Sequence, residues 1–412
     1  MDILRFITAG SVDDGKSTLI GRLLYDSKSI LTDQLEAIEK SSKNRNNGEI
    51  DLALLTDGLR AEREQGITID VAYRYFATEK RKYIIADAPG HVQYTRNMIT
   101  GASNSDLVII LIDARKGVIE QTRRHSLIAS LVGISKVFVA INKIDLIDYS
   151  EDRYNEIVAE YADVAKSLDL KNVLYFPISA LQGDNLVDKS IYTQWYKGET
   201  LLEALENVDV EPDYAHQESR FQVQLVIRPQ TPELHDYRGY AGRVISGLYK
   251  KGDKVRIFPS GLETKIDRIE FAGKEISEAV AGQSVTLLLT DNIDISRGDG
   301  IFLSKNDVIE SSEQEALVCW LDEKQLQTGH KYLLQHGHRK VRAIVKEIDF
   351  KLDVNTLLPS QVSEVKLNEV VKIKLKTNAP LAFDSYKKNK INGAAILIDE
   401  TSNKTVAAVL LQ

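Results

Sequence analysis

The first residues whose types and spacing could do chemistry lie near the start of the chain. The pattern G-x-x-x-x-G-K-[ST] is matched by Gly10-Ser11-Val12-Asp13-Asp14-Gly15-Lys16-Ser17, and Thr18 follows it. In such a phosphate-binding loop, or P-loop, backbone N–H groups turn towards a phosphate, the lysine reaches the β- and γ-phosphates, and the Ser17 hydroxyl can bind Mg²⁺. The alternative is a glycine-rich turn from a strand into a helix that holds no ligand.

A carboxylate that could complete a magnesium site follows in Asp87-Ala88-Pro89-Gly90-His91. Asp87 ends an apolar run, where it can hold a water of the Mg²⁺ shell, and Gly90 lets a backbone N–H approach a γ-phosphate. His91 could position the water that attacks this phosphate. A surface histidine on a turn is the alternative for His91.

Two further motifs could recognise a base. In Asn142-Lys143-Ile144-Asp145, the Asp145 carboxylate can accept two parallel hydrogen bonds from guanine N1 and the 2-amino group. Adenine lacks this pair of donors, so its entry would leave buried acceptors unpaired. Ser179-Ala180-Leu181 can supply backbone N–H groups to guanine O6. Each motif alone is weak, but in this order after a P-loop they predict that the nucleotide is GTP.

A threonine between the P-loop and Asp87 could act as a switch. It is Thr68, in the run Glu62-Arg63-Glu64-Gln65-Gly66-Ile67-Thr68-Ile69-Asp70. A threonine in a mobile segment can close over Mg²⁺ and the γ-phosphate and release them after hydrolysis. On spacing alone, a threonine in an ordinary β-strand is an equal alternative.

These motifs need strands and helices that hold them together. Up to about residue 190, short apolar runs rich in Ile and Val alternate with segments of helical periodicity. We predict strands over Leu4–Ala9, Tyr83–Asp87, Leu107–Asp113, Lys136–Asn142 and Val173–Ser179, and helices over Ser17–Tyr25, Gln121–Leu131 and Asp152–Leu168. Repeated β-α-β units imply an α/β domain with a mostly parallel sheet, which binds ligands at the carboxyl ends of its strands.

The second half of the chain has a different pattern. After the breaker cluster Glu211-Pro212-Asp213, short runs of alternating β-branched and polar residues recur between turns. About 200 residues of this kind predict two all-β barrel domains. We therefore expect a P-loop GTPase domain over 1–207, followed by one barrel over 208–305 and a second over 306–412.

Composition narrows the possible partners. The 412 residues include 53 Lys+Arg and 60 Asp+Glu, for a net charge of −7, so nucleic acid is a disfavoured partner. No apolar run approaches the roughly 18–20 residues that span a bilayer, so a membrane protein is not expected. The start lacks the pattern of a signal peptide, and Cys319 is the single cysteine. We expect a cytoplasmic protein without an internal disulfide.

The motifs together resemble the translation-factor GTPases. The resemblance rests on Arg63-Glu64-Gln65-Gly66-Ile67-Thr68-Ile69, on the form of the P-loop and on Asp87-Ala88-Pro89-Gly90-His91. It implies a GTPase domain followed by two β-barrels, with Thr68 as a magnesium ligand beside Ser17 and Asp87. It further implies that His91 positions the attacking water, and that Asp13 lies near the phosphates, beside a monovalent cation.

Downstream segments favour one branch of these GTPases. They resemble the GTPase subunit of bacterial sulfate adenylyltransferase in Trp195-Tyr196-Lys197-Gly198-Glu199-Thr200, Asp236-Tyr237-Arg238-Gly239-Tyr240, Asp294-Ile295-Ser296-Arg297-Gly298-Asp299 and Asn389-Lys390-Ile391-Asn392-Gly393. One departure is Asn392, where that family more often has threonine. Elongation factors that deliver aminoacyl-tRNA usually have His or Ser at Asp14, and such a factor is the alternative, together with a purely structural GTP-binding protein.

The second resemblance implies a reaction and a partner. GTP hydrolysis would drive ATP + sulfate → adenylylsulfate + pyrophosphate, a step of sulfate assimilation and cysteine biosynthesis whose equilibrium lies far towards ATP. A separate adenylyl-transferring catalytic subunit is implied, in a heterodimer or higher heteromer.

Three other features invite a functional interpretation that we do not adopt. His330, His336 and His338 match no standard zinc spacing, so buried, hydrogen-bonded or surface histidines are favoured. Cys319 lies in an apolar run and is expected to be an inert core thiol. Trp195 and Tyr196 are expected to pack between domains rather than to stack on a base.

Overall fold

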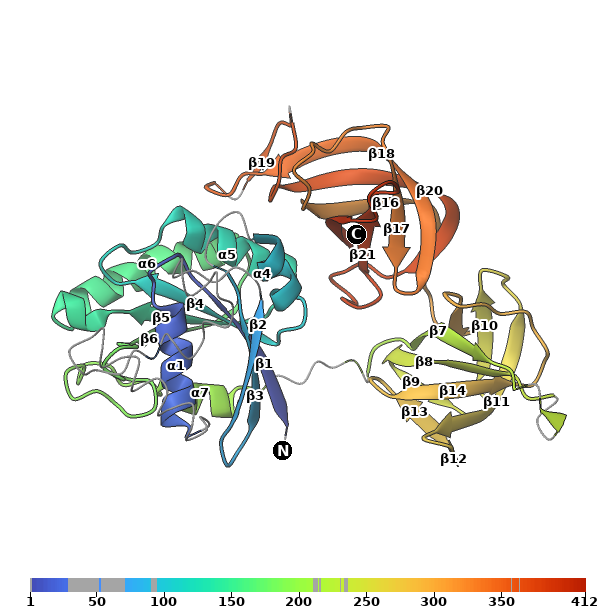
Figure 1. Ribbon diagram of the computed structural model, residues 1–412, viewed down its shortest axis with the longest axis horizontal. Helices are drawn as coiled ribbons and strands as arrows, with labels where there is room; N and C mark the ends of the chain where they lie inside the picture. Colours follow the sequence, from blue (N-terminus) through green and yellow to red (C-terminus); the bar gives the residue numbers. More distant parts are fainter. Residues whose placement is uncertain are drawn as a thin grey trace. The chain divides into compact units, whose positions relative to one another are not determined.

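This computed structural model describes residues 2–28, 52, 71–89, 95–209, 214, 216–229, 231–232, 236–356, 358–362 and 364–412. The chain forms two compact units, one of Met1–Val210 with Asp353–Leu358 and one of Glu211–Leu352 with Pro359–Gln412 (Figure 1). Within the described part, no helix is long and apolar enough to cross a bilayer. Thr68, Gly90 and His91 lie outside the described residues.

The first unit is built on a six-stranded sheet with the order β2-β3-β1-β4-β5-β6. Its strands are β1 (Ile3–Ala9), β2 (Ala72–Ala77), β3 (Lys82–Asp87), β4 (Leu107–Asp113), β5 (Lys136–Asn142) and β6 (Asn172–Pro177). Five of them are parallel, and only β2 runs antiparallel to its neighbour β3. Its helices are α1 (Lys16–Asp26), α4 (Thr95–Ala102), α5 (Glu120–Leu131), α6 (Glu151–Ser167) and α7 (Leu201–Asn207), with a 3-10 turn at Ile144–Ile147.

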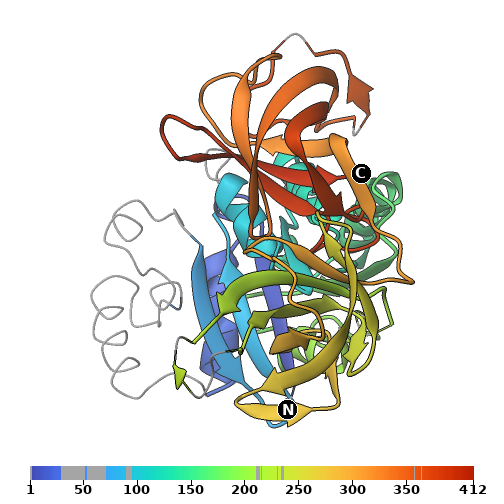
Figure 2. The ribbon, with the colours of Figure 1, turned by 90° about the vertical axis from the view of Figure 1, so that its right-hand side faces the viewer.

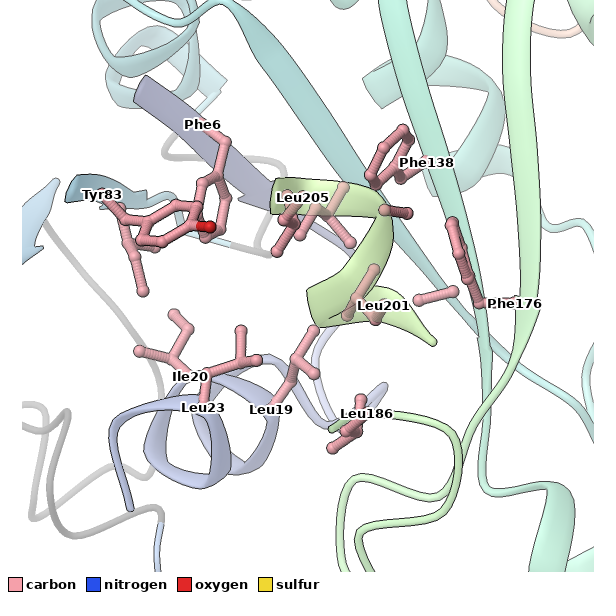
Figure 3. Close-up of a cluster of buried hydrophobic side chains, with 14 of the residues drawn as sticks. Phe6, Leu19, Ile20, Leu23, Tyr83, Phe138, Phe176, Leu186, Leu201 and Leu205 are labelled. Carbon is pink, nitrogen blue, oxygen red and sulfur yellow. The ribbon is translucent and has the colours of Figure 1, made fainter. Parts of the chain in front are cut away.

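Helices cover both faces of this sheet. Every residue of β4 is buried, as expected for a parallel strand between two layers of helices. One set of its side chains joins the core cluster that Figure 3 shows, where α1 and α7 pack against the sheet through Leu19, Ile20, Leu201 and Leu205. Because side chains alternate along a strand, the other set faces the layer to which α5 belongs.

The second unit contains two closed β-barrels. Six strands form each ring, in the order β10-β15-β7-β8-β14-β11 in the first barrel and β17-β21-β22-β16-β20-β18 in the second, with the last strand pairing with the first. Closure pairs the strand edges that an open sheet would expose. Figure 2 shows the first barrel in yellow-green to yellow and the second in orange to red.

The strands of the first barrel alternate inward apolar and outward polar residues. They are β7 (Arg220–Ile227), β8 (Gly239–Ser246), β9 (Leu248–Lys250), β10 (Lys254–Phe258), β11 (Glu263–Phe271), β12 (Lys274–Ile276), β13 (Glu278–Val280), β14 (Ser284–Leu289) and β15 (Gly300–Leu303). In β11, for example, Thr264 and Ile266 are buried while their neighbours Glu263 and Lys265 are exposed. This alternation places the apolar side chains in a common barrel core.

The second barrel is built in the same way from longer strands. They are β16 (Ile309–Trp320), β17 (Lys331–His336), β18 (Arg339–Leu352), β19 (Pro359–Ser360), β20 (Val370–Phe383), β21 (Ala394–Ile398) and β22 (Thr405–Leu411). The expected fold class, a mostly parallel α/β domain followed by two all-β barrels, is thereby confirmed.

The three features set aside in the sequence have plain structural roles. Trp195 donates a hydrogen bond from Nε1 to Tyr149 O (3.1 Å) and packs on Tyr154, so it contributes to the packing of the α/β unit. His336 is buried, with Nε2 within 2.8 Å of Asn392 O. Cys319 is a buried core residue, and burial raises the pKa of its thiol to about 12.

Candidate functional site

The P-loop connects β1 to α1, and its backbone conformation explains its glycines. Gly15 has φ of +94°, and a Cβ atom there would lie 2.4 Å from Asn142 Nδ2. Only glycine fits this position, because any side chain would meet both the left-handed backbone and the asparagine. Gly10 is also close-packed, since its Cβ would lie 3.0 Å from Leu111 Cβ. The turn is therefore fixed by β4 and β5 behind it.

The end of the loop provides the groups that an anion needs. Among the described residues, no side chain caps the first turn of α1, so its N–H groups face outward from the helix end. Such a helix end attracts anions through both its free donors and its dipole. The P-loop thus fits a phosphate, and the nearby Ser17 hydroxyl offers an oxygen of the type that Mg²⁺ prefers.

Asp14 is a buried carboxylate with one oxygen used and one unused. Its Oδ2 accepts a hydrogen bond from Ser11 N at 2.6 Å, whereas its buried Oδ1 has no partner in the described part of the chain. Burial raises the pKa of this carboxyl above its ordinary value. A buried acceptor without a donor is rare in proteins because it lowers stability. The unused oxygen therefore marks a place where a cation or water would be favoured.

Lys16 and Asp87 oppose each other across the carboxyl ends of β1 and β3. Lys16 Nζ lies 4.0 Å from Asp87 Oδ1, and the two side chains are only 7% and 2% exposed. The Thr8 hydroxyl donates to the same carboxylate at 3.5 Å. At this distance the attraction between two buried charges offsets little of the cost of removing them from water, because favourable buried pairs make short hydrogen bonds. The arrangement suits two charges that act on opposite sides of a phosphate and its metal ion.

The predicted base motif is joined directly to the P-loop. Asn142 donates from Nδ2 to Asp14 O at 2.7 Å and accepts at Oδ1 from Ala180 N at 2.9 Å. Lys143, in a left-handed conformation, donates from Nζ to Asp13 O. Asp145 follows in the first turn of the 3-10 helix. One motif therefore contacts both the phosphate loop and the loop after β6.

Asp113 belongs to this network and was missed by the sequence analysis. Its carboxylate lies 3.1 Å from Lys143 Nζ and accepts hydrogen bonds from Arg115 at 2.6 and 3.0 Å. Burial by itself would raise the pKa of Asp113, but these cations hold it well below its ordinary value. The available signal was its position, because Asp113 ends a buried strand as Asp87 does. It anchors Lys143 at the base of the P-loop.

The loop after β6 brings Ser179, Ala180 and Leu181 to the same edge of the sheet. Ser179 N donates to Asp184 O at 3.3 Å and Ala180 N to Asn142 Oδ1, while Leu181 N has no acceptor among the described residues. Leu181 is also 57% exposed, an unusual placement for a leucine beside so many buried groups. The structure thus brings together the P-loop, Asp87, the base motif and this loop.

Comparison with known proteins identifies the families of two parts of the chain. The model of the elongation factor Tu GTP binding domain matches residues 1–210, and that of the GTP-eEF1A C-terminal domain-like family matches residues 313–412. Among solved structures, the Ski7 GTPase-like domain of S. cerevisiae bound to GTP aligns over 100% of this chain and 97% of its own, with a TM-score of 0.53 and 18% identity. That likeness concerns the fold alone.

Curated relatives are much closer in sequence. Sulfate adenylyltransferase subunit 1 of Cellvibrio japonicus is 52% identical over 99% of this chain and 86% of its own length. The bifunctional enzyme CysN/CysC of Mycobacterium tuberculosis is 51% identical over 98% of this chain, which spans 66% of that protein. The chain therefore belongs to the family of sulfate adenylyltransferase subunit 1, and its residues 1–210 match the GTP-binding domain of the elongation factor Tu type.

Proposed function

We propose that this chain is the GTP-hydrolysing subunit of a heteromeric sulfate adenylyltransferase. The observation that carries the proposal is the double role of Asn142, which fixes the P-loop through Asp14 O and the loop after β6 through Ala180 N. A nucleotide held between these loops would have its phosphates at Lys16 and its base at Asp145. Family membership supplies the reaction to which hydrolysis is coupled.

Each residue of the site has a role in this proposal. The P-loop from Gly10 to Thr18 holds the phosphates, and Mg²⁺, which neutralises charge on the β- and γ-phosphates when bound, would be held by Ser17, Thr68 and Asp87. The unused oxygen of Asp14, next to Asp13, supports a monovalent cation beside the phosphates. Gly90 would contact the γ-phosphate, and His91 would orient the attacking water.

The base would be recognised by two elements. The Asp145 carboxylate accepts hydrogen bonds from guanine N1 and the 2-amino group, while the loop of Ser179, Ala180 and Leu181 donates to O6. The side chains of Lys143 and Leu181 would flank the ring. ATP would be rejected because adenine leaves the carboxylate without donors and presents its own donor to the loop.

The partner would be a catalytic subunit that transfers the adenylyl group, in a heterodimer or higher heteromer in the cytoplasm. In this assignment the GTPase domain spans 1–207 and the barrels span 208–305 and 306–412. GTP hydrolysis would drive adenylylsulfate formation past the point that ATP and sulfate reach alone. A ligand that binds without turning over can shift populations, but it cannot drive a net uphill reaction.

The endpoint of the reaction tests this coupling. The chain and its catalytic partner are incubated with ATP and sulfate at constant pyrophosphate, with GTP or with a non-hydrolysable GTP analogue, and adenylylsulfate is measured after it stops rising. We expect the final adenylylsulfate concentration to be higher with GTP than with the analogue. Equal endpoints would show that GTP is only an activator, and aminoacyl-tRNA binding by the chain would instead support the elongation-factor alternative.

A further inference from the structure

An arginine outside every recognised motif contacts the loop that would read guanine O6. Arg22 lies on α1, the helix that begins at the P-loop lysine, and donates from Nη1 to Leu181 O at 3.2 Å. Its Nε donates to Asp26 Oδ2 at 2.9 Å, which holds the guanidinium in place from the same helix. Arg22 therefore connects the phosphate-binding helix to the loop after β6.

The loop is shaped to receive this guanidinium. Gly183 has φ of +91°, and a Cβ atom there would lie 2.6 Å from Arg22 Nη2 and 2.8 Å from its Cζ. The backbone of Gly183 thus packs on the guanidinium without a side chain between them. Gly183 N also donates to Ser179 O at 2.8 Å, so the turn closes on itself directly over the arginine.

We propose that Arg22 is a positioning residue that sets the loop of residues 179–183 for recognition of guanine O6. Asn142 holds Ala180 N on one side of the peptide between Ala180 and Leu181, and Arg22 holds the Leu181 carbonyl on the other side. The two contacts together restrain the direction of the Leu181 N–H in that peptide, and Asp26 orients the planar donor that makes the second one. The inference rests on the proposed function, because it assumes that a guanine nucleotide occupies the site.

The remaining anchors of the loop show why Arg22 matters. Asn142 holds Ala180 N on the side of the base motif, and the Tyr149 hydroxyl donates to Asp184 Oδ2 at 3.0 Å beyond the turn. Between these two points, Gln182 N and Gly183 N donate to Ser179 and close the turn, and Arg22 contacts the carbonyl of the exposed Leu181 from α1. Loss of this contact leaves the turn closed on Ser179 but removes the side chain of α1 that sets the orientation of the Leu181 carbonyl.

The surroundings of Arg22 make it suitable for substitution. A hollow of about 390 Å³ lies beside it, lined by Arg22, Asp26, Gly183, Asp188 and the exposed Ile191. The Arg22 side chain is 25% exposed, so shortening it leaves no enclosed cavity. We therefore expect Arg22→Ala to change recognition rather than folding.

The test uses three guanine-like diphosphates and the full chain. GDP carries both O6 and the 2-amino group, 6-thio-GDP replaces O6 by a weaker sulfur acceptor, and IDP lacks the 2-amino group. Dissociation constants are measured by calorimetry for the wild type, Arg22→Ala and Arg22→Lys. Arg124→Ala is the matched control, because Arg124 makes an i,i+4 ion pair with Glu120 on α5 (2.9 Å) but has no contact with this loop.

Arg22→Ala should weaken GDP binding by about 5- to 20-fold, or roughly 1–1.8 kcal/mol, which is the upper part of the range for losing one hydrogen bond to O6. Binding of 6-thio-GDP should change by less than about 3-fold, so the preference for GDP over 6-thio-GDP falls. The preference for GDP over IDP should stay the same, because Asp145 reads the 2-amino group. The dissociation constant of Arg22→Lys for GDP should be nearer to that of Arg22→Ala than to that of the wild type, because lysine keeps the charge and loses the planar fork.

Other outcomes overturn the inference. Equal weakening of all three nucleotides would show that Arg22 acts through the P-loop or through folding, and no weakening would show that the contact is idle. A wild type that does not prefer GDP over 6-thio-GDP would show that the loop does not read O6. A wild type that binds ADP as tightly as GDP would overturn the proposed function itself, a result that the loop variants cannot produce.

Discussion

Two regions of the molecule bury charges, and they differ in how closely each charge is paired with partners in the chain. At the junction of the two barrels, Arg220 is fully buried and donates from Nε and Nη2 to Asp384 at 2.8 Å each. Its remaining donors reach Ser219 O at 3.1 Å and Glu218 Oε2 at 2.6 Å, and Asn392 completes the shell of Asp384 at 2.7 Å. At the nucleotide site, Lys16 and Asp87 are 4.0 Å apart.

The carboxyl pKa values show the same contrast. Burial would raise the pKa of Asp384, but hydrogen bonds from Arg220 and Asn392 hold it below its ordinary value. Burial raises the pKa of Asp14, and one backbone hydrogen bond is too little to reverse that shift. Charges that the protein satisfies by itself stabilise a junction. At the nucleotide site, the buried Oδ1 of Asp14 has no donor in the described part of the chain and is open to a ligand.

The largest effect is expected at the barrel junction. Asp384→Ala removes the buried carboxylate that accepts two hydrogen bonds from Arg220 and leaves the guanidinium with the half-buried Glu218. The loss of one partner of a buried pair lowers the free energy of unfolding by about 3–5 kcal/mol. Urea unfolding followed by the fluorescence of Trp320, in a Trp195→Phe background, reports the unit that contains both barrels.

A matched double variant separates the charge from the packing. Asp384→Leu with Arg220→Met removes both charges and should regain at least half of the lost stability, because apolar replacements for a buried pair are often neutral. A loss below about 1 kcal/mol for Asp384→Ala would mean that this junction is not held by the pair.

A smaller effect, of a different kind, is expected at the nucleotide site. Lys16→Ala removes a charge-assisted phosphate contact worth about 2–3 kcal/mol and should weaken GTP binding by roughly 30- to 150-fold. Without nucleotide, the same variant should unfold within about 1 kcal/mol of the wild type, since its ion pair with Asp87 is long. Calorimetry measures the GTP affinity. Urea unfolding followed by the fluorescence of Trp195, in a Trp320→Phe background, measures the stability without nucleotide. A destabilisation as large as that of Asp384→Ala would erase the contrast between the regions.

The sequence predicts the two regions unequally well, for physical reasons. The strands Leu107–Asp113 and Lys136–Asn142 were predicted with their observed bounds, because a strand buried on both faces is a continuous apolar run. The strand Ala72–Ala77 was missed, since it lies at the sheet edge with Tyr75 65% exposed and only Phe76 buried. An edge strand needs few apolar residues and so leaves a weak pattern.

Long-range pairs are harder still to predict. The P-loop and base motif are recognisable because each is a short run whose chemistry is local. Arg220 and Asp384 are 164 residues apart, and nothing in either neighbourhood specifies the other. Their pairing depends on how two closed barrels pack, which is a property of the assembled unit. The contact of Arg22 with Leu181, 159 residues apart, depends in the same way on how α1 packs beside the loop after β6 in the folded α/β unit.

The smallest effect, and the sharpest form of the comparison, is the dependence of stability on pH. Asp384 has a lowered pKa, so its stabilisation is complete above the unfolded pKa near 3.8 and is lost as the pH falls through the folded value. Asp14 has a raised pKa in the folded chain, so at pH values above that pKa its ionised form destabilises the folded chain. This penalty disappears as the pH falls towards the unfolded pKa near 3.8.

Two isosteric variants should therefore respond in different pH windows. Asp14→Asn should stabilise the α/β unit at pH 7, by an amount that shrinks to zero near pH 4, with a slope of at most about 1.4 kcal/mol per pH unit. Asp384→Asn should destabilise the barrel unit at pH 7 and lose that difference only below about pH 4. Urea unfolding at pH 3–7, followed by Trp195 for the first variant and Trp320 for the second, measures both. If Asp14→Asn destabilises the α/β unit at pH 7, its carboxylate is satisfied within the folded chain, and the unused oxygen does not mark a cation site.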